Sequence, residues 1–268
     1  MEDLRVSLCQ ADIVWEDPQG NFKLFEQFFE QIEQTDLILL PEMFNTGFSM
    51  RSADLAEQMD GATVNWMRKQ AEIQQAVICG SLIVEEEGKY FNRLVWMKPD
   101  GTYETYDKRH LFRMANENNH FSAGNKRLIV ELKGWKIMPL VCYDLRFPVW
   151  SRNRFETDRN SFAKAEYDLL FYIANWPEPR VEAWKKLLAA RAIENQAYVV
   201  GLNRIGTDGK DVPYSGGSRY IDTKGELMWK AEDHQTTVQT MTLSAKELAD
   251  FRKKFPVGMD GDEFGLGV

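Results

Sequence analysis

The chain has 268 residues, of which 44% are hydrophobic and 28% are charged, and its formal net charge is −8. These are ordinary values for a globular protein with a sizeable core. The negative charge argues against nucleic acid and anionic membranes as main partners, because both attract basic surfaces. No apolar run approaches the roughly 18 residues that a membrane span needs, so we expect no membrane partner.

The cysteines limit the compartment in which the protein works. Cys9, Cys79 and Cys142 are an odd, widely spaced set without a Cys-x-x-Cys pair, which argues against a disulfide framework and a structural zinc site. Free thiols are typical of a reducing cytoplasm. The acidic residues Glu2 and Asp3, with no long apolar stretch after them, are unlike a secretory signal. We therefore expect a cytoplasmic protein.

Strands and helices alternate along the first half of the chain. Alternating apolar residues predict a strand over 4–11, and Asp17-Pro18 begins a helix that runs to about residue 34. Further strands are expected at 37–40, 76–84, 90–97 and 102–106, with a second helix at 63–75. The polar stretch 107–124 lacks a regular pattern, and its aromatic residues favour an ordered, functional loop.

The second half contains more hairpins. Strands at 128–132 and 136–141 flank a turn, followed by a strand at 167–173, a helix at 181–195 and a strand at 197–202. Strands at 218–222, 227–230 and 236–243 precede a final helix, in which Ser244 and Glu247 form a capping box, and an extended tail from Pro256. The pattern predicts an α/β fold with a mixed sheet or two stacked sheets, helices outside, in one domain over 1–268.

Cys142 ends the apolar run 138–141, and the polar residues Tyr143, Asp144 and Arg146 follow at once. Ligands of open α/β sheets bind at the carboxyl ends of strands, so the thiol is a candidate site residue. Free cysteines are also among the most buried residues and commonly act as small hydrophobes. This stretch by itself leaves both interpretations open.

Two other strands, which we also predict to be buried, end near a charged residue. Glu42 follows the strand at 37–40, and Lys108 follows the strand at 102–106. If all three strands share a sheet, the carboxylate, the ammonium and the Cys142 thiol converge at one edge. A thiol is mostly protonated at neutral pH and needs a base or a cation to attack. Taken singly, Glu42 is equally well an exposed loop acid, and Lys108 part of a solvated charge cluster.

Their chemistry is complementary. Glu42 can accept the thiol proton, while Lys108 can lower the thiol pKa and stabilise an oxyanion, with the Tyr143 N–H as a second donor. Histidine is the commoner base beside a cysteine. The sequence has three histidines, at 110, 120 and 234, and none follows a predicted buried strand.

Three segments together resemble the nitrilase superfamily of carbon–nitrogen hydrolases. They are LLPEMF at 39–44, YDKRHLF at 106–112 and LVCYDLRFP at 140–148, and ARAIENQ at 190–196 extends the resemblance over essentially the whole chain. Three motifs in this order are specific, whereas one alone would be weak. The variants are most similar to the omega-amidase branch, which hydrolyses the distal amide of 2-oxoglutaramate and related short ω-amides.

The resemblance implies roles for matching residues. Cys142 would be the nucleophile, Glu42 the general base and Lys108 the cation that stabilises the intermediate. Glu117 matches a second glutamate that holds the lysine, although Asn118-Asn119 departs from the family pattern, and whether its role is chemical or positional stays open. The reaction implied is amide hydrolysis through a cysteine thioester, without metal or organic cofactor.

The resemblance also implies a four-layer α-β-β-α sandwich of the nitrilase type. Its members pair through helices, so we expect a homodimer or higher homo-oligomer formed by the helices around 149–154 and 181–195. Arg191 and Glu194 in the second of these helices are then expected to form a structural ion pair.

The expected substrate is a short amide with a carboxylate at its far end. Arg146 is one candidate to bind that carboxylate, and an ion pair with Asp144 is its equal alternative. Trp176 is expected either as an aromatic wall or as a core residue, and Phe48 and Phe121 would line the mouth. Two alternatives remain: another amidase of the superfamily, acting on N-carbamoyl amino acids, aliphatic amides or nitriles, and a non-catalytic small-molecule binding protein.

Overall fold

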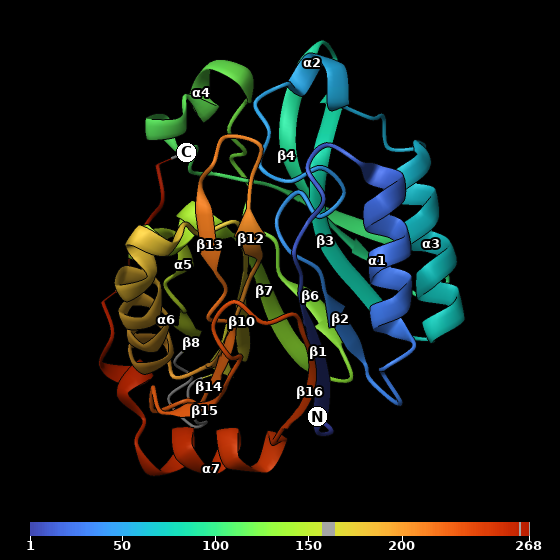
Figure 1. Ribbon diagram of the computed structural model, residues 1–268. Helices are drawn as coiled ribbons and strands as arrows, with labels where there is room; N and C mark the ends of the chain where they lie inside the picture. Colours follow the sequence, from blue (N-terminus) through green and yellow to red (C-terminus); the bar gives the residue numbers. More distant parts are fainter. Residues whose placement is uncertain (157–163, 263, 268) are drawn as a thin grey trace.

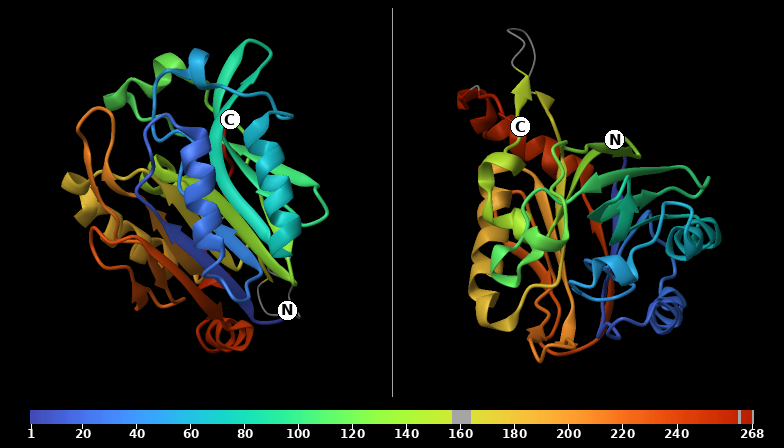
Figure 2. Two further views of the ribbon diagram at one scale, coloured as in Figure 1. Left: turned by 45° about the vertical axis from the view of Figure 1, so that its right-hand side comes forward. Right: turned by 90° about the horizontal axis from the view of Figure 1, so that it is seen from above.

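A computed structural model of the chain describes residues 1–156, 164–262 and 264–267. Two six-stranded sheets stack face to face, and helices cover the outer face of each (Figure 1). Seen from above, the four layers lie side by side in the order α-β-β-α (Figure 2). This confirms the predicted α/β class and the four-layer sandwich.

The first sheet is built mainly from the N-terminal half of the chain. Its order is β16-β1-β2-β3-β4-β5, in which β1, β2 and β3 run parallel and the other neighbours are antiparallel. The strands are β1 Leu4–Gln10, β2 Leu37–Leu39, β3 Val77–Glu86, β4 Lys89–Met97, β5 Tyr103–Asp107 and β16 Thr237–Leu243. The predicted buried strand at 102–106 is in fact the edge strand β5, and only Tyr106 within it is buried.

Helices α1 (Pro18–Phe29) and α3 (Ala62–Gln74) cover the outer face of this sheet, and α2 (Ser52–Leu55) is a single short turn. The Asp17 side chain caps α1 by accepting from the Gly20 N–H, and phenylalanines at helical spacing pack against the sheet. The helix ends at Phe29 rather than near residue 34. The N–H groups of Gln31 and Ile32 bond carbonyls three residues back, which tightens and ends the helix.

The second sheet has the order β15-β14-β11-β10-β7-β6, with β7, β10 and β11 parallel. Its strands are β6 Val130–Leu132, β7 Trp135–Val141, β10 Leu169–Ala174, β11 Tyr198–Asn203, β14 Arg219–Ile221 and β15 Leu227–Lys230. Helices α5 (Pro148–Ser151) and α6 (Val181–Asn195) lie outside it. Gly201 permits the close packing of α6, because a Cβ there would lie 2.4 Å from Leu188 Cδ1.

The main core fills the space between the two sheets. Alternate residues of β1, such as Leu4, Val6 and Leu8, point into it, whereas Cys9 belongs to the second cluster under α1 and α3. Trp96 of the first sheet stacks on Phe171 of the second with ring centroids 6.3 Å apart. Because the sheets share one core, residues that follow strands of different sheets can meet at one end of the sandwich.

Several short elements were not predicted. The hairpin of β12 (Ile205–Thr207) and β13 (Pro213–Ser215) rises beside the cavity described below, and β8 (Phe155–Glu156) pairs with β9 (Lys164–Ala165). One half of the predicted capping box of α7 (Ala245–Lys254) is present, since Ser244 Oγ accepts from the Glu247 N–H, while the Glu247 carboxylate accepts from the Tyr198 hydroxyl. The tail is not extended throughout: residues Val257–Asp260 form the 3₁₀ turn η4, where Gly258 N–H donates to Gln196.

None of the described helices is long and apolar enough to cross a membrane.

Candidate active site

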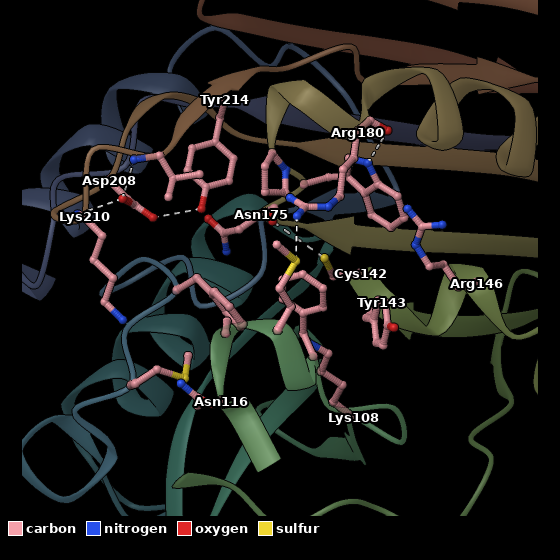
Figure 3. A pocket seen from close by; sticks show the side chains of 18 residues that line it. Lys108, Asn116, Cys142, Tyr143, Arg146, Asn175, Arg180, Asp208, Lys210 and Tyr214 are labelled. Atoms are coloured by element: carbon pink, nitrogen blue, oxygen red, sulfur yellow. Dashed lines mark hydrogen bonds between the residues drawn. The ribbon is translucent and has the colours of Figure 1, made fainter. Parts of the chain in front are cut away.

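A cavity of about 370 Å³ opens where strands of both sheets end, and Figure 3 shows the side chains that line it. Its lining includes six residues that the sequence analysis selected, namely Phe48, Lys108, Cys142, Tyr143, Arg146 and Trp176. Glu42 and Glu117 lie behind Lys108 and are fully buried. The predicted nucleophile, cation and carboxylates therefore converge at one place.

These groups converge across the sandwich and not within one sheet. Glu42 follows β2 and Lys108 follows β5 of the first sheet, whereas Cys142 follows β7 of the second. The premise that the three strands share a sheet is wrong. The groups still meet because the carboxyl ends of β2 and β7 lie at the same end of the shared core.

Lys108 lies between two carboxylates. Its Nζ atom is 2.8 Å from Glu42 Oε1 and 2.9 Å from each carboxylate oxygen of Glu117, which is the first residue of α4 (Glu117–His120). The side chains of all three are at most 1% exposed. Glu42 is thus not an exposed loop acid, and Lys108 is not part of a solvated cluster.

The charges of Lys108, Glu42 and Glu117 shift the pKa values of Lys108 and Glu117. Burial by itself lowers the pKa of Lys108, but the carboxylates of Glu117 and Glu42 outweigh it and raise that pKa well above its usual range. Burial raises the pKa of Glu117, and the nearby charge of Glu42 raises it further, while Lys108 opposes the shift. The lysine therefore remains a cation, fixed by ion pairs to two buried carboxylates.

Cys142 occupies a sharp turn between β7 and the 3₁₀ segment η2 (Cys142–Arg146). Its φ angle is +44°, a left-handed conformation that is rare for residues other than glycine and is characteristic of strained functional positions. Its Sγ atom lies 3.8 Å from the carbonyl oxygen of Asn175, and 8% of the residue is exposed, in the cavity. The turn presents the thiol to whatever occupies the cavity.

Burial raises the pKa of the Cys142 thiol well above its ordinary value, and the negative charge of Glu42 raises it further, whereas Lys108 opposes the shift. The thiol is therefore neutral at pH 7, so it must lose its proton as it attacks. Glu42, whose negative charge acts on the thiol, is the nearby carboxylate that can accept it.

Two asparagines that were not predicted as site residues hold Glu42. Asn92 Nδ2, on β4, donates to Glu42 Oε1 at 2.8 Å. The backbone N–H of Asn175, just after β10, donates to Glu42 Oε2 at 2.9 Å, and its side-chain amide donates to the Glu42 carbonyl oxygen. A polar residue inside an otherwise buried strand, as at Asn92, was the available signal.

The predicted walls of the cavity are mostly in place. The Arg146 guanidinium carbon lies 5.0 Å from the centre of a Trp176 ring, and Lys108 Nζ lies 5.1 Å from the centre of the Phe48 ring. Trp176 is both wall and core, because it also packs on Trp184. Phe121 does not line the cavity but packs in a buried cluster with Met43, Met50 and Ile83, so that expectation is corrected.

The alternative ion pair between Arg146 and Asp144 is also wrong. Asp144 is fully buried and accepts from Tyr106, His110 and the Val141 N–H, which leaves no oxygen for the arginine. Arg146 is instead exposed at the cavity. The expected pair of Arg191 and Glu194 is present at 3.0 Å, away from the cavity.

Further wall residues come from segments that the sequence analysis left aside. Arg180 lies over the Phe112 ring, and Lys210 lies on the loop between β12 and β13. Asp208 and Tyr214, also in the lining, bond each other at 2.9 Å. Figure 3 shows Arg146 and Arg180 on one side of the cavity and Lys210 on the other. Among the described residues, no group of histidine, cysteine and acidic side chains is arranged to hold a metal ion.

The fold and this buried cluster define a hydrolase of the α-β-β-α sandwich class. The chain belongs to the carbon–nitrogen hydrolase family, whose model matches residues 5–253. It is 48% identical over 266 residues, which is 99% of this chain and 100% of the relative, to "Omega-amidase YafV" of Escherichia coli. It is 32% identical over 256 residues to the "2-oxoglutaramate amidase" of Bacillus subtilis, covering 94% of this chain and 95% of that protein.

Solved structures agree with this assignment. A CN-hydrolase superfamily protein from Xanthomonas campestris, described with an arsenic adduct in its active site, is 48% identical with a TM-score of 0.95 over 100% of both chains. Nit3 of Saccharomyces cerevisiae, from the nitrilase superfamily, shares the fold at 21% identity and a TM-score of 0.80, over 96% of this chain and 95% of that one. The predicted family is confirmed, and the chain is an amidohydrolase that acts on non-peptide carbon–nitrogen bonds.

Proposed function

We propose that the protein hydrolyses the terminal amide of short 2-oxo dicarboxylic monoamides, such as 2-oxoglutaramate and 2-oxosuccinamate, through a thioester on Cys142. The observation that carries the proposal is the contact of Lys108 with Glu42 and Glu117 beside the cysteine, at the inner end of a cavity with cationic walls. The names of the Escherichia coli and Bacillus subtilis relatives support this substrate class.

In the first half of the reaction, Cys142 Sγ bonds to the amide carbonyl carbon and Glu42 accepts the thiol proton. The carbonyl oxygen becomes an oxyanion beside the Lys108 ammonium and the Tyr143 N–H, which stabilise it as preorganised donors. The carbon–nitrogen bond then breaks, and Glu42 returns the proton to the departing nitrogen, which leaves as ammonia. Because burial and Glu42 raise the pKa of the thiol, the attack requires Glu42 as the proton acceptor.

In the second half, a water molecule attacks the thioester carbon while Glu42 accepts its proton. The carbon–sulfur bond breaks, the acid product forms and the proton returns to sulfur. Glu117 contacts Lys108 with both oxygens and also accepts from the Phe112 N–H, so we assign it the role of holding the lysine in place.

The cavity walls favour an anionic substrate. Lys108 is paired with two carboxylates, but Arg146, Arg180 and Lys210 have no carboxylate partner among the described residues. The one acid in the lining, Asp208, is held by Tyr214 and by backbone N–H groups. A chain with a net charge of −8 thus has a cavity with three unpaired cations, which suits a carboxylate at the far end of the amide.

The test is ammonia release from 2-oxoglutaramate by the wild type and by Cys142→Ala, beside glutamine, an N-carbamoyl amino acid, a neutral aliphatic amide and a nitrile. We expect the fastest release from 2-oxoglutaramate, and none from the variant. Preference for another amide on the panel would place the protein with other amidases of the superfamily. No activity on any of them, with Cys142 also inert to electrophiles, would indicate a binding protein.

We also propose a cytoplasmic homodimer. The three free cysteines support a reducing compartment. Val149 on α5 and Ile193 on α6 are 58% and 57% exposed, and apolar side chains of this size on outer helices support pairing through that face. Sedimentation of the wild type and of a Val149→Lys/Ile193→Lys variant tests this, because only the wild type should form a dimer.

A further inference from the structure

We propose that Asp144 is a positioning residue that fixes the backbone of Cys142 against the segment that carries Lys108. The proposal concerns the same site and rests on the proposed roles of these two residues. Asp144 is fully buried, does not line the cavity and binds donors other than Arg146. Its carboxylate instead joins the two sheets at the point where the reacting groups meet.

Each oxygen of Asp144 accepts two hydrogen bonds. Oδ1 accepts from the backbone N–H of His110 at 3.0 Å and from His110 Nδ1 at 2.8 Å. Oδ2 accepts from the Tyr106 hydroxyl at 2.8 Å and from the backbone N–H of Val141 at 3.1 Å. An ionised carboxylate offers about four acceptor positions, so this one is fully used.

The hydrogen-bond partners of Asp144 are close in sequence to Lys108 and Cys142. Tyr106 and His110 lie two residues before and two residues after Lys108, and Val141 directly precedes Cys142. Cys142 needs support because its φ of +44° is unfavourable for a residue with a side chain. The bond from Val141 N–H to Asp144 closes the turn that holds this conformation.

The partners are themselves held rigidly. The Tyr106 hydroxyl accepts from Trp150 Nε1 at 3.0 Å and from the backbone N–H of Arg109 at 3.2 Å. The His110 ring stacks on Phe147 with centroids 3.8 Å apart and planes at 6°. Asp144 therefore connects two stiff segments, and a shift of either would move Lys108 relative to the thiol.

Asp144→Asn tests the proposal with little change of volume. The amide has a single oxygen, so its NH₂ group must face either the Val141 N–H or the His110 N–H, and one of these backbone donors loses its partner. We expect kcat on the wild-type substrate and the rate of Cys142 alkylation by iodoacetamide each to fall by at least about tenfold, since catalysis is sensitive to small misplacements. KM should stay within about threefold, because Asp144 does not line the cavity.

A matched pair of tyrosine variants separates positioning from stability. Tyr106→Phe removes the hydroxyl bonded to Asp144, whereas Tyr220→Phe removes a hydroxyl that is equally buried and 2.8 Å from the carbonyls of Val6 and Gln239. Both should lower the free energy of unfolding. Only Tyr106→Phe should slow alkylation and lower kcat, by about threefold or more. The pair keeps the proposal testable if Asp144→Asn does not fold.

Peptide mapping should place the label on Cys142, since Cys9 and Cys79 are fully buried. The proposal is overturned if Asp144→Asn keeps kcat and the alkylation rate within about twofold of the wild type. It is also overturned if Tyr106→Phe and Tyr220→Phe change both rates equally. If the wild type hydrolyses no amide, the proposed function fails separately, and the alkylation rates still decide the role of Asp144.

Discussion

The Nζ atom of Lys108 lies 2.8 Å from Oε1 of Glu42, although two strands separate β5 from β2 in the sheet that carries both residues. Water is excluded from the contact, because the side chains are 1% and 0% exposed. The lysine thus pairs with two buried carboxylates, Glu42 and Glu117, while remaining available to the cavity. Removal of the lysine leaves both carboxylates without a cation, with consequences for both stability and activity.

Lys108→Met is expected to abolish amide hydrolysis and to lower the free energy of unfolding at pH 7.5 by about 3–5 kcal/mol, because Glu42 and Glu117 are left facing each other in a dry site. Urea unfolding followed by circular dichroism measures the loss. Lys210→Met removes an exposed lysine of the same cavity and should change this free energy by less than about 0.5 kcal/mol.

The loss of unfolding free energy caused by Lys108→Met should become smaller as the pH falls. Burial and Glu42 raise the folded-state pKa of Glu117, and removal of the opposing lysine raises it further. A carboxyl group whose pKa is higher in the folded state than in the unfolded state stabilises the fold as it becomes protonated, so acidification favours the variant. If Lys108→Met lost the same free energy of unfolding at pH 5 as at pH 7.5, the raised pKa of Glu117 would be contradicted.

Glu42→Gln separates thiol ionisation from catalysis. We expect kcat to fall by about 10²–10⁴-fold, the usual contribution of a general base. Because the negative charge of Glu42 raises the pKa of Cys142 and Lys108 lowers it, the variant thiol should ionise at a lower pH than the wild-type thiol. The pH dependence of iodoacetamide labelling measures this. A labelling profile displaced to higher pH in the variant would show that Glu42 does not act on the thiol as proposed.

Arg146→Ala should raise KM for 2-oxoglutaramate by about tenfold or more, the effect of losing a charge-assisted contact with a carboxylate. KM for a neutral amide of similar length should not change. Arg180→Met serves as the comparison on the same wall, because that guanidinium also lies over an aromatic ring without a carboxylate partner among the described residues. If only Arg180→Met raises KM for the anionic amide, the carboxylate is bound by Arg180 and not by Arg146.

Gly124→Ala should disrupt the segment that carries Lys108. A Cβ at Gly124 would lie 2.1 Å from the carbonyl oxygen of Asp107, and the Gly124 N–H donates to the Lys108 carbonyl at 3.0 Å. We expect a lower thermal midpoint and loss of most activity. Gly265→Ala is the control, since a Cβ at Gly265 would have no atom of the described residues within 4 Å, and this variant should resemble the wild type. Full activity of Gly124→Ala would show that this loop is not rigid during catalysis.

The class of the fold and the chemical groups of the site could be predicted from the amino-acid sequence alone. Hydrophobic alternation located most strands, and three short motifs selected Glu42, Lys108 and Cys142. These predictions succeed because periodicity and residue chemistry are local properties. Local patterns were also sufficient for the α7 cap at Ser244, where one side chain bonds a backbone group three residues away.

The way in which these groups meet could not be predicted, because it depends on tertiary contacts. The site forms across two sheets, Asn175 reaches Glu42 over 133 residues of chain, and Asp144 spans 34 residues to bind His110 and not its neighbour Arg146. Phe121 likewise lies in a buried cluster and not at the cavity mouth. Such contacts depend on how the sheets stack and on which buried donors need an acceptor, and neither is encoded in the spacing of residues along one segment.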